Sequence, residues 1–264
     1  MRIRATVAAV IGAVALSALA VPAAQAAPAG PAVTFSAVKV NSGKAIVVGP
    51  TTKVSVNASY TVTKPANLSA NDFLTGPLLY RGSTIEMSGR TLISDQPGSC
   101  TAASSTVLKC TAKILFPPVD AGDSGDLLNS DAGTWKIGAL AVDDAGITTK
   151  GGFGTINLQR KATLTTNATP EPVKKGATIT VTGKLSRANW DTNRYAGYST
   201  QPVKLQFRKK GSTTYSTVKT ITTSTTGGLK TTVKATVDGY YRFAFAGTTT
   251  TPAVNAAGDF IDVR

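Results

Sequence analysis

The sequence predicts an all-β protein built from two β-sandwich domains. Short runs of residues alternate between apolar and polar side chains, and clusters of Gly, Pro, Asn and Asp separate these runs at a spacing of roughly 8–12 residues. No apolar pattern keeps the helical period of about 3.6 residues over three turns. Val and Thr fill the runs, and β-branched side chains suit a pleated, half-buried surface. The length of 264 residues fits two domains.

Alternation gives the expected strands in order. In the first half, residues 53–62, 107–116 and 135–142 alternate, and residues 151–158 are expected to form a closing strand. In the second half, a new run opens at 162–167, followed by alternating runs at 177–183, 203–207, 218–221, 229–237 and 241–245. The connection from Ser186 to Pro202 has no strand pattern, and we expect a long loop there.

A domain boundary is expected near Gln159–Lys161, which gives a signal peptide at 1–26, one sandwich at 27–159 and a second at 160–264. Charge supports this division. The net charge of residues 27–159 is +1, whereas that of residues 160–264 is +11. Nearly all of the excess positive charge therefore belongs to the second domain.

The first 26 residues have the pattern of a cleaved signal peptide. Arg2 and Arg4 precede an apolar run over residues 5–21, and Ala24-Gln25-Ala26 fits cleavage before Ala27. An uncleaved membrane anchor is the alternative, which the break at Pro22 disfavours. No second apolar run approaches membrane-spanning length, so we expect a secreted protein, extracellular or associated with the cell wall, with no membrane span in its mature form.

The two cysteines are expected to pair. Cys100 and Cys110 would close a loop of about 11 residues, and an oxidising exterior favours the disulfide. The alternative, a reactive dithiol, lacks the C-x-x-C spacing that lowers a thiol pKa. The pair is therefore predicted to be a structural link.

Two groups of residues resemble known modules. Asp131–Trp135, followed by Ala139–Gly146, is similar to the late strands of bacterial immunoglobulin-like modules. Pro170–Trp190, Val203–Lys210 and Asp238–Phe243 resemble a C-terminal module of secreted two-domain proteins from filamentous actinobacteria. The resemblance implies two tandem immunoglobulin-like sandwiches in an extracellular setting. It supplies no catalytic residues, and relatives that carry a calcium-binding label make calcium a hypothesis.

An acidic stretch is the candidate calcium site. Asp120, Asp123, Asp126 and Asp131 lie in a Gly-rich segment, and calcium prefers six to eight oxygen ligands. The spacing departs from an EF-hand loop, because Asp131 stands where a bidentate Glu is needed. The alternative is a solvated loop in which Asp and Gly serve turn geometry. Calcium is the only cofactor that the sequence suggests.

Basic and aromatic residues of the second domain are the candidate binding site for an extracellular polyanion or cell-wall polymer. Its positive charges would interact with the polymer and its aromatic rings, if exposed, would stack on it. The candidate residues are Lys174, Lys175, Arg187, Trp190, Arg194, Tyr195, Tyr198, Arg208, Lys209 and Lys210. Two alternatives stay open: Trp190 could instead plug the end of the sandwich, and like charge could serve only solubility. Ordered chromosomal DNA is not an expected partner outside the cell.

Catalysis is not expected. The sequence contains no histidine, which excludes Ser-His and Cys-His nucleophile pairs and histidine-ligated zinc. The two glutamates, Glu86 and Glu171, fall in different domains, and no phosphate-binding glycine loop or nucleophile elbow is present. The sequence thus predicts a non-catalytic binding or structural protein. The alternatives are a calcium-binding protein that uses residues 120–131 and, less favoured, a secreted hydrolase with an Asp-based site.

Overall fold

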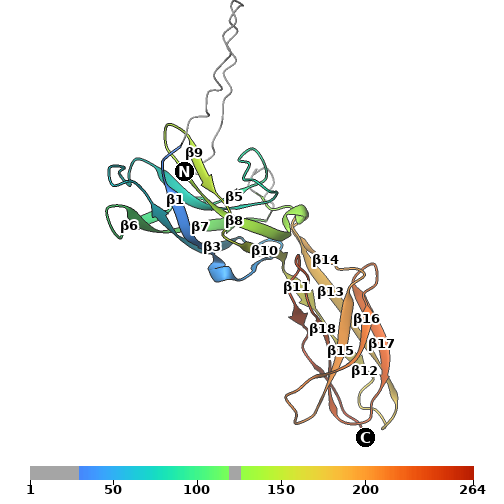
Figure 1. The fold of residues 1–264 in the computed structure, drawn as a ribbon. Helices are drawn as coiled ribbons and strands as arrows, with labels where there is room; N and C mark the ends of the chain where they lie inside the picture. Colours follow the sequence, from blue (N-terminus) through green and yellow to red (C-terminus); the bar gives the residue numbers. More distant parts are fainter. Residues whose placement is uncertain (1–29, 119–125) are drawn as a thin grey trace, which may run out of the picture. The chain divides into compact units, whose positions relative to one another are not determined.

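The computed structural model describes residues 30–118 and 126–264, and these residues are almost entirely in strands and turns. The helical content of this part is two single-turn 3-10 helices, η1 (Asn41–Gly43) and η2 (Asn129–Asp131). Figure 1 shows the strands, coloured along the sequence from blue to red. The prediction of an all-β protein is confirmed. The expected signal peptide at 1–26 lies outside the described residues.

Ten strands form the first pair of sheets. They are β1 (Thr34–Val40), β2 (Ile46–Val48), β3 (Val54–Thr63), β4 (Leu74–Tyr80), β5 (Leu92–Ile93), β6 (Ser99–Ala102), β7 (Val107–Phe116), β8 (Gly133–Val142), β9 (Ile147–Lys150) and β10 (Thr155–Arg160). One sheet has the order β1-β3-β7-β6, and the other has the order β2-β10-β8-β4-β5 with β9 on β8. Strand β2 runs parallel to β10, which pairs Leu158 with Ile46.

Ten further strands form the second pair of sheets. They are β11 (Ala162–Leu164), β12 (Asn167–Thr169), β13 (Thr178–Asn189), β14 (Arg194–Gly197), β15 (Pro202–Lys209), β16 (Ser216–Thr222), β17 (Gly228–Lys234), β18 (Gly239–Phe245), β19 (Val254–Asn255) and β20 (Asp259–Ile261). In one sheet β13 pairs with β11, β12, β14 and β17; the other has the order β16-β15-β18-β19, with β20 also on β18.

Both pairs of sheets have the strand order of an immunoglobulin-like domain, which sets strands A-B-E-D against C-F-G. In the first pair, β1-β3-β7-β6 corresponds to A-B-E-D, and β4-β8-β10 to C-F-G. In the second pair, β13 is strand B between the A-type strands β11 and β12 and strand E, β17. Strands β15 and β18 with β19 and β20 then correspond to C-F-G. The predicted fold class is therefore confirmed.

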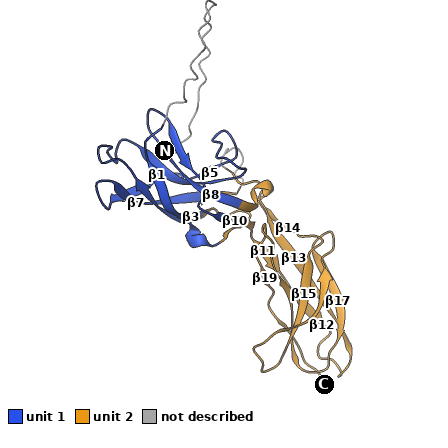
Figure 2. Cartoon of the chain, in the orientation of Figure 1, with its two compact units in different colours: residues 1–44, 55–115, 135–156 blue, residues 45–54, 116–134, 157–264 orange. Residues whose placement is uncertain are grey.

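The backbone groups into two compact units (Figure 2). Among the described residues, unit 1 contains 30–44, 55–115 and 135–156, and unit 2 contains 45–54, 116–118, 126–134 and 157–264. Each unit is therefore discontinuous in sequence.

Alternation along the strands separates a core side from a solvent side. On β3, Val56, Ala58 and Tyr60 are buried, whereas the residues between them are exposed. On β18, Tyr241 and Phe243 are buried in the core of unit 2 together with residues of β13 and β15. Because successive side chains of a strand point to opposite faces, every second position of these strands remains available at the surface.

Candidate functional site

The predicted disulfide is present. Cys100 on β6 and Cys110 on β7 face each other in the antiparallel pair, and their sulfurs are 2.01 Å apart. The bond joins two neighbouring strands of one sheet, whereas the disulfide of antibody domains joins the two sheets. It closes the β6–β7 turn in unit 1.

The acidic stretch is only partly described. Asp120 and Asp123 lie outside the described residues, while Asp126 and Asp131 are buried. Asp131 Oδ2 accepts a hydrogen bond from the Leu128 backbone N–H at 2.8 Å, so this carboxylate caps η2. Within 30–118 and 126–264, no three His, Cys, Asp or Glu side chains gather as a metal-binding group. The calcium site stays a prediction.

The long loop expected over 186–202 is wrong. Strand β13 continues to Asn189, and β14 folds back on it to form a hairpin that pairs Asn189 with Arg194. The polar residues Ser186, Arg187 and Asn189 interrupt the apolar–polar alternation, so the sequence pattern does not indicate a strand here. Ser186 and Ala188 are nevertheless buried in the structure.

Trp190 is fully buried in unit 2. Its indole Nε1–H points at the backbone carbonyls of Val48, at 3.3 Å, and Gly49, at 3.1 Å. Its backbone N–H donates to Asn129 Oδ1 at 3.0 Å. All four residues belong to unit 2. Trp190 is therefore a packing residue, as the plug alternative expected, and the ring is not available for stacking on a ligand.

Arg187 and Tyr198 also have local structural partners. The Arg187 guanidinium lies 3.8 Å from the Tyr198 ring centroid and donates to Thr251 Oγ1 at 3.2 Å. Burial lowers the pKa of Arg187, and burial together with the charge on Arg187 lowers the pKa of Arg160 to about 10. Both cations are thus partly withdrawn from water.

The other members of the predicted set divide between two ends of β13. Arg194 and Tyr195 are exposed on β14, which pairs with the last residues of β13. Lys174 and Lys175 are exposed in the turn before β13, at the other end of a strand about 36 Å long. The ten predicted residues therefore do not form one site.

Arg208 and Lys210 belong to a larger cluster on the sheet formed by β15, β16, β18 and β20. Tyr215 precedes β16, Tyr240 and Arg242 lie on β18, and Phe260 lies on β20. We call Arg208, Lys210, Tyr215, Tyr240, Arg242 and Phe260 the arginine–tyrosine face. Lys209 is exposed beside it at the end of β15.

Cations and rings follow one another across this face. The Arg242 Cζ atom lies 3.8 Å from the Tyr215 ring centroid, and Arg208 Cζ lies 5.3 Å from the same centroid and 4.1 Å from that of Tyr240. The Tyr240 and Phe260 centroids are 5.1 Å apart. Lys210 Nζ completes the series at 5.4 Å from the Phe260 centroid. Each contact between a cation and a ring is attractive because the ring face is electron-rich.

Strand register explains why these residues meet. Arg208 is paired with Tyr240 across β15 and β18, and Gln206 is paired with Arg242. Directly opposite residues share one face of a sheet, and here the buried alternate positions leave these four at the surface. A Cβ at Gly258 would lie 2.2 Å from Tyr215 Oη, so this glycine leaves space for the tyrosine.

Two hydrogen bonds hold the arginines. Arg242 Nε donates to Gln206 Oε1 at 2.9 Å, and Arg208 donates through an Nη to the Ser212 carbonyl at 2.5 Å. Neither arginine forms an ion pair with another residue of 30–118 or 126–264. The carboxylates of this part of the chain have other partners.

Four aspartates of unit 2 bind backbone N–H groups or another cation rather than Arg208 or Arg242. Asp191 accepts from the Asn129 N–H, Asp259 from the Ala168 N–H and Asp238 from the Val263 N–H, while Asp262 pairs with Arg264. The hydrogen bond from Val263, with the nearby Lys210, lowers the pKa of Asp238. Lys210 Nζ pairs with Asp238 Oδ2 at 3.5 Å, whereas Arg208 and Arg242 have no carboxylate partner among the described residues.

Sequence reasoning missed Tyr215, Tyr240, Arg242 and Phe260. The signal for two of them was present, since alternation over 241–245 places Tyr240 and Arg242 on the side away from the core. The positions of Tyr215 and Phe260 are set by a turn and by pairing between strands distant in sequence, and alternation predicts neither.

The strand order places both pairs of sheets in the class of immunoglobulin-like β-sandwiches. No protein-family model matches the sequence, and no curated protein matches it. Among solved structures, the chain is similar to a chimeric titin Z1Z2-Z1Z2 tandem, at 12% identity and a TM-score of 0.29 over 84% of this chain and 95% of that chain.

Two further structures show similarity of the same order. An I-band fragment of titin has 11% identity and a TM-score of 0.33 over 88% of this chain and 65% of that chain. The D0-D1 domain of intimin has 16% identity and a TM-score of 0.27 over 86% of this chain and 98% of that chain. Separately, the described residues contain no helix long and apolar enough to cross a membrane.

Proposed function

We propose that the protein is an exported, non-catalytic binding protein whose arginine–tyrosine face holds an anionic extracellular or cell-wall polymer. The observation that carries the proposal is the pair Arg208 and Arg242, stacked on tyrosine rings and free of ion pairs with the described residues. The signal-peptide pattern and the disulfide support export, because disulfides persist in oxidising compartments.

An arginine stacked on an aromatic ring is already oriented to bind an anionic ligand. A guanidinium packed by its flat face against a ring keeps N–H groups at its edge, and these match the oxygens of a phosphate or carboxylate. Because ring contacts and hydrogen bonds already restrict both side chains, binding costs less conformational entropy than it would for mobile lysines. Phosphate-linked wall polymers and acidic glycans offer such oxygens in a repeating series.

The ordinary alternative is that the charge of +11 on residues 160–264 serves only solubility. Under that alternative, the position of a removed charge does not matter. The test therefore compares variants that lose the same charge from the two sheets of unit 2.

The experiment measures binding of the mature full chain to a poly(glycerol phosphate) teichoic acid by calorimetry at low salt. Arg208→Gln with Arg242→Gln should weaken binding by roughly tenfold or more, because two charge-assisted contacts are lost. The matched control, Lys230→Gln with Lys234→Gln, removes two exposed positive charges from β17 in the other sheet and should change affinity little. Equal losses in the two variants would reduce the proposal to a net-charge effect.

A second pair of substitutions separates charge from shape. Arg208→Lys with Arg242→Lys keeps the charge but loses the planar guanidinium, and we expect an affinity between those of the wild type and the glutamine variant. For all variants, affinity should fall with salt, and the slope of log affinity against log salt should be shallower in the glutamine variant. Circular dichroism checks that each variant is folded.

A further inference from the structure

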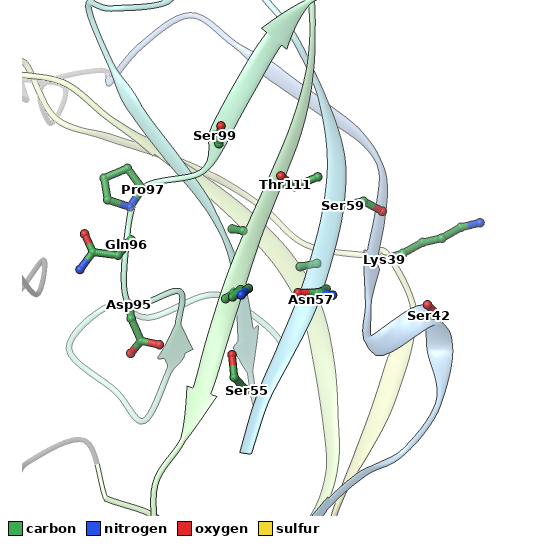
Figure 3. A pocket seen from close by; sticks show the side chains of 13 residues that line it. Lys39, Ser42, Ser55, Asn57, Ser59, Asp95, Gln96, Pro97, Ser99 and Thr111 are labelled. Carbon is green, nitrogen blue, oxygen red and sulfur yellow. The ribbon is translucent and has the colours of Figure 1, made fainter. Parts of the chain in front are cut away.

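Unit 1 contains a hollow that the proposed function does not use. It lies over the outward side of the β1-β3-β7-β6 sheet and has a volume of about 900 Å³. Figure 3 shows Asp95, Gln96 and Pro97 along one side and Lys39 with Ser42 along the other, with Asn57 and Ser55 between them. We call this hollow the polar groove.

Short side chains keep the groove open. Ser55, Asn57 and Ser59 are exposed residues of β3, which lies between β1 and β7 in the sheet. Asn is depleted in strands, where β-branched and aromatic residues are favoured. Because β3 is an interior strand of the sheet, Ser55, Asn57 and Ser59 lower its strand propensity. They also leave hydrogen-bonding groups at the floor of the groove, about 7 Å apart along the strand.

The rim beside Lys39 has an unusual backbone. Ala37, Asn41 and Ser42 have φ values of 51°, 49° and 51°, and they are three of the five non-glycine residues with positive φ in the described chain. The pairing of β1 with β3 shifts register between Ser36 and Lys39, so that Lys39 lies opposite Ser59. Left-handed backbone in non-glycine residues costs free energy, and it gathers where a surface is shaped for binding.

The lining defines the chemistry of an occupant. Hydroxyl and carboxamide side chains predominate among the lining residues, none of these residues is aromatic, and the charged ones are Lys39, Lys113 and Asp95. A net charge of about +1 does not match a dense polyanion, and the lack of rings removes the stacking on which single-stranded nucleic acid depends. Hydroxyl groups both donate and accept hydrogen bonds, as the hydroxyls of a sugar do.

An extended peptide fits the groove less well. Peptides that bind sheets usually add to an exposed edge, where backbone groups are unpaired. The floor here is the face of β3 and β7, whose backbone groups pair within the sheet. A ligand must therefore bond to side chains, which suits a chain rich in hydroxyls.

We propose that the polar groove binds a chain of uncharged sugar residues. This site is separate from the arginine–tyrosine face, so each proposal can fail without the other. Its affinity should not depend on salt, because no charged contact is needed, whereas binding to the arginine–tyrosine face should weaken as salt rises.

The test titrates the mature full chain with hexasaccharides of β-1,4-linked glucose and of β-1,4-linked N-acetylglucosamine, at millimolar concentration and at two salt concentrations. At least one should bind, with equal affinity at about 50 and 200 mM salt. Asn57→Ala with Ser59→Ala should weaken that binding about tenfold, since two neutral hydrogen bonds are lost.

The matched control is Thr101→Ala with Ser104→Ala, which removes two exposed hydroxyls of unit 1 that do not line the groove. It should bind as the wild type does. The proposal is overturned if neither hexasaccharide binds, if the groove variant retains full affinity, or if the control loses as much. Binding of an unstructured peptide or of teichoic acid that is abolished by Asn57→Ala with Ser59→Ala would also overturn it.

Discussion

The two sandwiches use the same strand order, but each carries different chemistry on the outward side of one sheet: unit 1 on its A-B-E-D sheet and unit 2 on its C-F-G sheet. In unit 1, the positions between Val56, Ala58 and Tyr60 on β3 are short and uncharged. In unit 2, the positions on either side of the buried Tyr241 on β18 carry Tyr240 and Arg242. Strand alternation assigns one residue in two to the core and leaves the other unconstrained by the fold. The comparison teaches that fold and ligand chemistry are specified by different residues of the same strands.

The units also differ in how their outer segments are held. Unit 1 has a disulfide between β6 and β7. Unit 2 contains no cysteine, and it is tied by polar contacts of Trp190 and Asn129 to segments far away in sequence. The following substitutions measure how much the disulfide and the contacts of Trp190 and Asn129 contribute to the free energy of unfolding.

The largest effect is expected for Trp190→Ala. The indole is fully buried and donates to the carbonyl of Gly49, so removing it leaves a cavity and unsatisfied acceptors. The free energy of unfolding should fall by about 3–5 kcal/mol. Urea denaturation followed by circular dichroism measures this loss, with the conservative Trp190→Phe expected to lose less. A loss below about 1 kcal/mol would show that the ring is not a core residue.

Removal of the disulfide ranks second. Cys100→Ala with Cys110→Ala opens a loop of about 11 residues, which corresponds to roughly 2.5–3 kcal/mol of chain entropy. Urea denaturation of unit 1 can be followed through Trp135 in a Trp190→Phe background, because the chain has two tryptophans. The unmodified protein should contain no free thiol. Detection of two reactive thiols in the folded, exported protein would contradict the pairing.

Asn129→Ala should have a smaller effect on unit 2. Its side chain accepts from the Trp190 N–H at 3.0 Å and donates to Asn189 Oδ1 at 2.8 Å, and truncation leaves both partners unsatisfied. We expect a loss of about 1–3 kcal/mol in the free energy of unfolding. The control Asn255→Ala removes an exposed amide from β19 and should be nearly neutral. If the two variants unfold alike, Asn129 does not tie the unit.

The smallest effect is the pH dependence that Asp238 adds. The Val263 N–H and Lys210 favour the charged carboxylate, so its pKa is lower in the folded than in the unfolded protein. The resulting stability is present above the unfolded pKa and is lost as the pH falls through the folded pKa. Below about pH 4, the free energy of unfolding of Asp238→Asn should therefore fall less steeply with decreasing pH than that of the wild type. Identical curves would show that Asp238 is not linked to folding.

Alternation predicted the strands well where one side of the strand is apolar. Residues 107–116 were expected as a strand and form β7, and residues 203–207 lie within β15. It failed at β14 because that strand, with Arg194 and Tyr195 exposed, has no regular apolar side. The register bulge at Lys39 likewise leaves no trace in the hydrophobic pattern.

The candidate site was predictable only in part. Arg208 and Lys210 were predictable because positive charge clusters at residues 208–210 of the sequence. Their ring partners Tyr240 and Phe260 come from strands that meet only through sheet pairing. Trp190 was named as a candidate for stacking, but composition alone cannot distinguish a buried tryptophan from an exposed one.

Unit 2 is discontinuous in sequence, and this affects how the protein can be made and inherited. Val48 and Trp190, which contact each other within it, are 142 residues apart. At ribosomal rates, Val48 precedes its partner by on the order of 10 s. The indole contacts of Val48 and Gly49 therefore cannot form until Trp190 has been synthesised. A gene rearrangement that moved only residues 160–264 into another protein would separate this tryptophan from both of its carbonyl acceptors. The two sandwiches are consequently expected to be inherited together.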